Sequence, residues 1–159
     1  MPWFLAIPIL GGANGNRTMT PIAVVCWFAY TGHLQVAGTW AFWTANIISA
    51  IVFTVCALGE YIGDKLPQTP NRTAPAPLGA RIVFGGLVGA IVVTSLHMPL
   101  AAGVLLGAVS ALAGAFLGFH LRRYITIGRG HPDFPVALAE DVVTVGLAFL
   151  ALHLVTIAA

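Results

Sequence analysis

Long apolar runs, separated by short polar corners, make up most of the chain. Five runs are long enough to cross a bilayer: residues 19–34, 40–63, 78–97, 100–120 and 136–157. Runs of about 20 apolar residues predict spanning helices, whereas strands of a membrane barrel alternate over about ten residues. The pattern therefore predicts an all-α fold, a polytopic transmembrane helix bundle with five spanning helices in a single domain, residues 1–159.

The start of the chain departs from this pattern. Residues 2–10 form an apolar stretch of about half the length that a spanning helix needs, so it either lies at the interface or enters the membrane as half of a broken helix. Residues 11–18 follow, with three glycines and two asparagines. This segment is either an ordinary interfacial loop or unwound backbone inside the membrane. In the second reading Asn14, Asn16 and free backbone groups frame a ligand site, as broken helices do in transporters.

Composition strengthens the membrane interpretation. Hydrophobic residues make up 58% of the chain and charged residues 8%, whereas about 25% is usual in soluble domains. Such a chain cannot cover itself with polar surface in water. The formal net charge of +2 is too small to favour nucleic acid as a partner. Cys26 and Cys56 lie inside apolar runs without metal-ligand spacing, so we expect both to act as small hydrophobic residues and to form no disulfide.

All basic residues lie in or beside three corners that are separated by two crossings each. They are Arg17, Lys65, Arg72, Arg81, Arg122, Arg123 and Arg129. The connections 33–39 and 97–99 contain no lysine or arginine. The positive-inside rule therefore places the three corners in the cytoplasm and the protein in the cytoplasmic (inner) membrane. The repeated order of helix, polar corner, proline and helix also suggests three helical hairpins related by an axis along the membrane normal.

Five charged side chains lie near predicted helix ends. The helix dipole disfavours three of them, and the other two are acids near a helix start, where the dipole favours them. Glu60 and Asp64 lie at a predicted helix C-terminus, the negative pole, and Arg81 lies in a first turn, the positive pole. If the corner folds back, these charges meet, and Glu140, Asp141 and Arg17 join them. The cluster is either a network of salt bridges that holds the bundle together or a polar cavity that binds a substrate or ion. Arg122 and Arg123 are read as interface anchors.

Small residues recur at a spacing of four. Gly85 and Gly89, Gly103 and Gly107, and Gly114 and Gly118 each form a G-x-x-x-G pair, and Ala111 continues the last two. This spacing lines one helix face and lets helix backbones approach closely. We therefore expect these faces to be packing surfaces between helices, and a small bundle with several of them to be capable of homo-oligomerisation.

Three stretches carry a resemblance to a known family. They are Gly15-Asn16-Arg17 before an apolar helix, the run from Glu60 to Pro67 (E-Y-I-G-D-K-L-P), and Glu140-Asp141 near the start of the last helix. Together they resemble a bacterial family of small membrane proteins known as domain of unknown function 4126, in which Asn16 stands where an apolar residue is expected. The resemblance implies a membrane protein, points to Arg17, Glu60, Asp64, Lys65 and Glu140, and implies no activity.

The resulting hypothesis is a transporter or channel-like protein with a polar site near the cytoplasmic side. Its ligand would be a small anion or cation, without a metal or other cofactor, bound by Asn14, Asn16, Arg17, Glu60, Asp64, Lys65, Arg81, Glu140 and Asp141. The alternative is a structural or partner-binding subunit whose buried charges only hold helices together. Catalysis is not expected, because the corners lack a paired-aspartate metal motif, a nucleophile elbow and a glycine-rich phosphate loop.

Overall fold

The computed structural model describes residues 3–64 and 73–157, in which all regular structure is helical. The α-helices are α1 (Trp3–Asn16), α2 (Met19–Tyr30), α3 (Ile47–Gly63), α4 (Pro75–Ser95), α5 (Leu100–Arg123) and α6 (Asp133–Ile157). A 3-10 turn, η1 (Phe42–Ala45), precedes α3, and a π-helical turn, η2 (Tyr124–Gly128), continues α5. The all-α prediction is confirmed.

Three helices, rather than the predicted five, are long and apolar enough to cross a membrane. They are Pro75–Ser95 with 21 residues, Leu100–Gly128 with 29 and Asp133–Ile157 with 25. The helices α2 and α3 are apolar but shorter, with 12 and 17 residues. At 1.5 Å per residue α2 extends only about 18 Å, well short of about 30 Å of hydrocarbon.

Local chemistry explains both shortened helices. The chain turns after α2 at Gly32, whose φ of 79° lies in the left-handed region that glycine tolerates best. Residues 42–45 then form η1 in place of the predicted α-helix. Asn46 is extended, and its side chain accepts a hydrogen bond from the Ile48 amide at 2.9 Å. This N-cap fixes the start of α3 at Ile47.

The interruption between the first two helices is shorter than the glycines and asparagines at residues 11–18 suggested. Residues 11–16 are helical and belong to α1, so the prediction of unwound or loop backbone there is wrong; only Arg17 and Thr18 interrupt the helix. Pro21 accounts for the position of the break. In a continuous helix its ring would clash with the carbonyl of residue 17, whereas in the first turn of α2 its missing N–H costs nothing.

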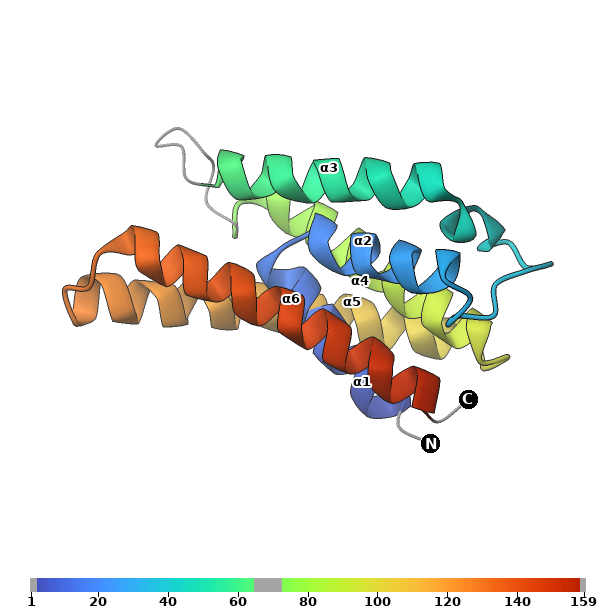
Figure 1. Ribbon diagram of the computed structural model, residues 1–159. Coiled ribbons are helices and arrows are strands. Elements are labelled where there is room, and N and C mark those ends of the chain that lie inside the picture. Colours follow the sequence, from blue (N-terminus) through green and yellow to red (C-terminus); the bar gives the residue numbers. More distant parts are fainter. Residues whose placement is uncertain (1–2, 65–72, 158–159) are drawn as a thin grey trace.

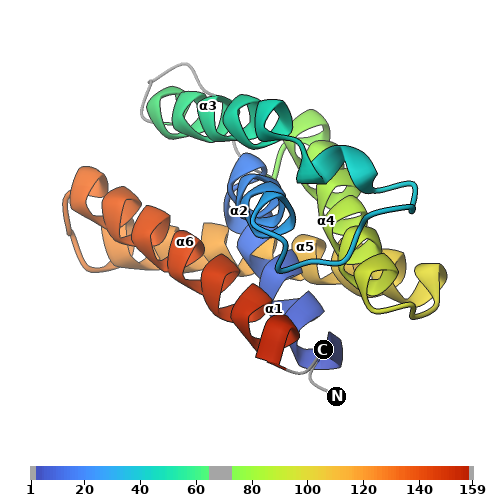
Figure 2. The ribbon, with the colours of Figure 1, turned by 45° about the vertical axis from the view of Figure 1, so that its right-hand side comes forward.

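The helices α1 and α2 form a hairpin that enters the bundle and returns to the same end. In Figure 1 α3 ends, α4 begins and the turn from α5 to α6 lies at one end of the bundle, which we call the corner end. The start of α1 and the end of α6 lie at the opposite end, which we call the terminal end. From the terminal end α1 runs inward, the chain turns at Arg17 and Thr18, and α2 runs back. Figure 2 shows this re-entrant hairpin lying inside the arc of α3, α4, α5 and α6.

Close backbone contacts seat both α1 and α4 on α5. A Cβ atom on either Gly11 or Gly85 would lie 2.7 Å from the Gly107 carbonyl oxygen, and one on Gly89 would meet Gly103. Such contacts require small residues on the crossing faces, which confirms the predicted packing role of the G-x-x-x-G pairs. Gly15 faces Ala111 and its neighbours, near the middle of α5 and η2. The re-entrant hairpin therefore ends about halfway along the longest helix.

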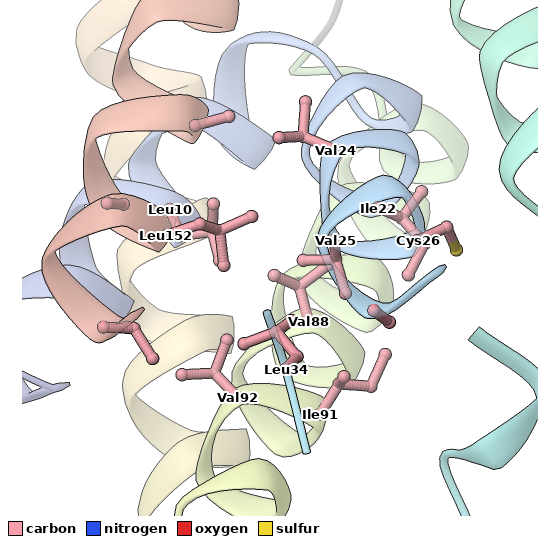
Figure 3. Packing of buried hydrophobic residues seen from close by; sticks show 14 of the residues in the cluster. Leu10, Ile22, Val24, Val25, Cys26, Leu34, Val88, Ile91, Val92 and Leu152 are labelled. Atoms are coloured by element: carbon pink, nitrogen blue, oxygen red, sulfur yellow. The ribbon is translucent and has the colours of Figure 1, made fainter. Parts of the chain in front are cut away.

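The apolar core surrounds the re-entrant hairpin. Figure 3 shows Leu10 of α1 and Val25 of α2 packing with Val88 of α4 and Leu152 of α6, and each of these side chains is at most 1% exposed. In contrast, α3 buries only alanines, at positions 50 and 57, and packs mainly on α2. The first hairpin is thus the most enclosed part of the fold, although it is too short to cross a bilayer.

Candidate functional site

Arg17 lies at the tip of the re-entrant hairpin and is completely buried. Its Nε donates to Asp141 Oδ1 at 2.7 Å, and Nη2 lies 2.6 Å from the same oxygen. Its Nη1 lies 2.8 Å from Asp64 Oδ2. The guanidinium also lies over the ring of Tyr61, 5.5 Å from the centroid. One arginine therefore joins the hairpin to the end of α3 and to α6.

The electrostatic surroundings keep this arginine charged. Burial by itself lowers the pKa of Arg17, but Asp64, Asp141 and Glu140 outweigh that effect, and the pKa stands above its ordinary value. A guanidinium does not lose its proton in proteins. The tip consequently carries a permanent positive charge inside an apolar bundle, and its stability depends on the carboxylates around it.

Glu60 binds the exposed start of α2. Its two carboxylate oxygens accept hydrogen bonds from the backbone amides of Thr18 and Met19, both at 2.8 Å. These amides lack partners inside their own helix, and a carboxylate suits the positive pole of the macrodipole. Next to this contact, the Thr20 hydroxyl and the Tyr61 hydroxyl share a hydrogen bond of 2.6 Å. The acid that is misplaced at the end of α3 is therefore well placed at the start of α2.

Arg81 binds the other half of the re-entrant hairpin. Its Nη1 donates to the Gly15 carbonyl at 2.6 Å, at the C-terminal end of α1, and Nη2 lies 3.8 Å from Glu60 Oε1. The amide of Asn14 donates in return to the Arg81 carbonyl at 3.1 Å. The predicted approach of Arg81 to Glu60 is confirmed, and a backbone carbonyl is an additional partner that charge patterns do not reveal.

Arg122 also belongs to this cluster, which corrects its interpretation as an isolated interface anchor. Its Nη1 lies 2.9 Å from Asp64 Oδ2 and 3.6 Å from Glu140 Oε2. Its Nε and Nη2 form a two-pronged contact with Asp133 at 2.8 and 2.7 Å. The signal in the sequence was the short α5–α6 turn, because it places residues just before and just after it side by side.

A family model described as Domain of unknown function (DUF4126) matches residues 5–159 of the chain. The chain belongs to this family. No curated protein and no solved structure matches it significantly. The DUF4126 match spans the whole cluster described above, so the buried charges lie within the family domain rather than in an appendage.

We call the joined side chains of this DUF4126 protein the tip network: Arg17, Glu60, Asp64, Arg81, Arg122, Asp133, Glu140 and Asp141. Six of them were predicted site residues, and Arg122 and Asp133 were not. Of the remaining predicted residues, Asn14 contacts Arg81, and Asn16 directly precedes Arg17. Lys65 lies outside the described residues.

The described part of the DUF4126 chain contains no group of three or more His, Cys, Asp or Glu side chains arranged for a metal ion. Cys26 and Cys56 are free thiols. Two surface hollows lie elsewhere: an apolar groove of about 540 Å³ along α4 and α5, bordered by Trp40, and one of about 480 Å³ near η1. No residue of the tip network lines either of them. The tip network is therefore separate from these two hollows.

Proposed function

We propose that this protein is an integral membrane transporter or channel-like protein whose polar site is the tip network. The observation that supports this proposal is the fully buried Arg17, placed between two half-length helices and paired with carboxylates of α3 and α6. Re-entrant segments and broken helices with ionisable groups at their ends are typical of substrate and ion sites in membranes.

The cost of the tip network supports a functional role. A charged side chain inside a membrane bundle costs several kcal/mol unless it is paired, so such residues usually mark pathways or relays. An apolar tip would seat the hairpin on α5 equally well through the glycine contacts. Ion pairs add what apolar packing lacks, namely groups that exchange partners when a proton, an ion or a solute arrives.

We also propose that the corner end faces the cytoplasm. Three arginines lie at this end: Arg122 and Arg123 in the last turn of α5, and Arg129 directly after η2. The terminal end carries the connections 33–39 and 97–99, which have no lysine or arginine. By the positive-inside rule this asymmetry supports a cytoplasmic corner end, with the start of α1 and the end of α6 outside. Cysteines introduced as Arg129→Cys and Gly38→Cys, each labelled from either side of sealed vesicles, test this orientation, because the two positions should react from opposite sides.

A second candidate function is structural. Arg17 is inaccessible and already contacts two carboxylates, and Glu60 is occupied by two amides, so the network is internally matched. On that interpretation the charges only hold the helices together, and the protein is a structural or partner-binding subunit. The two functions differ in whether removing one charge affects passage of a solute or only stability.

The test uses the full chain reconstituted in liposomes. Proton entry is followed with an internal pH dye, Na⁺ and K⁺ movement with a potential-sensitive dye, and small-solute entry by light scattering. Glu60→Gln and Asp141→Asn each remove one charge from the buried part of the network. Arg123→Gln is the matched control, because Arg123 also carries a charge at the corner end but is exposed and does not belong to the network.

We expect the two buried variants to insert and fold but to lose the flux of the wild type, and the control to keep it. Normal flux in both buried variants would refute the transport proposal. No flux of any probe in the wild type, together with a lower melting temperature in both buried variants, would favour the structural function.

A further inference from the structure

We propose that the last turn of α1 binds a small monovalent cation through the side-chain oxygen of Asn14. A role for this cation in driving transport would rest on the proposed transport function, whereas the binding of the cation does not. The site lies where the re-entrant hairpin turns, between α1 and α4, and it selects between the two ligand classes, anion and cation, that the sequence left open.

Asn14 carries an acceptor atom that the protein leaves unsatisfied. The residue is fully buried, and its Nδ2 donates to the Arg81 carbonyl at 3.1 Å. Within residues 3–64 and 73–157, its Oδ1 has no hydrogen-bond partner. Exchanging the positions of Nδ2 and Oδ1 would place two acceptor oxygens against each other. The hydrogen bond to Arg81 therefore fixes Oδ1 as the atom without a partner. A buried acceptor without a partner costs about 1–3 kcal/mol.

This oxygen lies in a region that is already rich in acceptors. In the last turn of α1 the Ala13 carbonyl accepts from the Arg17 amide at 2.9 Å and the Gly15 carbonyl accepts from Arg81, and the macrodipole places its negative pole there. The side-chain oxygen of Asn16, two residues on, is likewise buried without a hydrogen-bond partner. The ends of broken helices in transporters hold Na⁺ or protons in this way, with backbone and side-chain oxygens.

The neighbouring cations do not reverse this preference. Asp64 and Asp141 compensate the charge of Arg17 at 2.8 and 2.6 Å. Arg81 donates to the Gly15 carbonyl and approaches Glu60. The arginines that would attract an anion are thus engaged by the protein's own carboxylates and carbonyls. Neutral amide and carbonyl oxygens suit a monovalent cation, whereas Ca²⁺ and Mg²⁺ favour carboxylate ligands.

The experiment measures the melting temperature of the full-length protein in detergent from its tryptophan fluorescence. Na⁺, K⁺ and NH₄⁺ are the probes, each exchanged at constant chloride against N-methylglucamine, which is too large for an internal site. A ligand that binds only the folded protein raises its stability with its concentration. We expect at least one of the three cations to raise the melting temperature in a saturable manner.

Three variants define the site. Asn14→Leu should abolish the effect of the cation, and Asn14→Asp, which keeps an oxygen at the same place, should retain it even if the leucine variant does not fold. Thr144→Val is the matched control. Thr144 is also fully buried, but its hydroxyl donates to the Glu140 carbonyl at 2.8 Å, within α6. The control should keep the response of the wild type.

Three outcomes would overturn the proposal: no cation effect in the wild type, as expected if only water fills the site; an equal effect in Asn14→Leu; or loss of the effect in Asn14→Asp. Cation binding without flux in liposomes would refute transport and leave the site intact. Flux that does not depend on the cation, with no shift in melting temperature, would refute the site and leave transport intact.

Discussion

Replacing Gly15 with alanine should displace the tip of the re-entrant hairpin from α5. The added Cβ would meet the Ala111 carbonyl oxygen, the Ala115 nitrogen and, at 2.7 Å, the Gly114 carbonyl carbon. All three are backbone atoms of a packed helix and cannot rotate away. Overpacking of this kind costs about 1–3 kcal/mol, while alanine recovers about 0.5–1 kcal/mol of helix propensity. The net expected loss is about 1–2 kcal/mol.

Gly12→Ala is the control for this prediction. Gly12 lies in the same helix, one turn earlier, and a Cβ there would meet nothing within 4 Å. We expect that variant to be unchanged or slightly more stable. For a chain of this size the Gly15→Ala melting temperature should fall by about 2–8 °C. Thermal unfolding in detergent followed by tryptophan fluorescence measures both. Equal melting temperatures in the two variants would refute the close seating of α1 on α5.

Three further substitutions test other contacts by the same measurement. Arg17→Met should destabilise the protein by about 3–5 kcal/mol, because the buried Asp141 and the half-buried Asp64 each lose a cationic partner. The exposed Arg123→Met should change stability by less than about 0.5 kcal/mol, and similar losses in the two variants would contradict the pairing. Glu60→Ala should cost about 1–2 kcal/mol by uncapping α2, and an unchanged melting temperature would count against the cap. Asn46→Ala should cost about 1 kcal/mol by uncapping α3, and a longer α3 with undiminished stability would contradict it.

Helix content was predictable from the apolar runs, but helix boundaries were not. The run at residues 40–63 is apolar enough to be predicted as one helix, yet its first part folds as η1. Asn46 was the available signal, because asparagine before a long apolar stretch is a typical N-cap. The run at residues 19–34 was likewise judged by hydrophobicity alone, and Gly32 marked its actual end. Hydrophobicity shows only that a segment tolerates an apolar environment. An α-helix, a 3-10 turn and a buried loop all do so, and hydrophobicity therefore does not locate helix ends.

The candidate site was predicted where opposite charges met and missed where the backbone was the partner. The helix-dipole argument correctly brought Arg81 to Glu60. It did not predict that Glu60 accepts hydrogen bonds from the Thr18 and Met19 amides, because every residue other than proline has a backbone amide and the sequence does not show which one is exposed. Arg122 was missed for a different reason: its position alone placed it at an interface, and the α5–α6 turn brings it next to Asp133 and Glu140.

The order of synthesis gives the re-entrant hairpin an unusual history. Its hydrogen-bonding partner Asp141 lies 124 residues after Arg17, and its seat on α5 includes Gly107. Translation proceeds from the N-terminus, so the first hairpin to leave the ribosome completes its contacts only when α6 has been made. Until then Arg17 lacks Asp141, and a charge that is not fully paired is costly inside lipid.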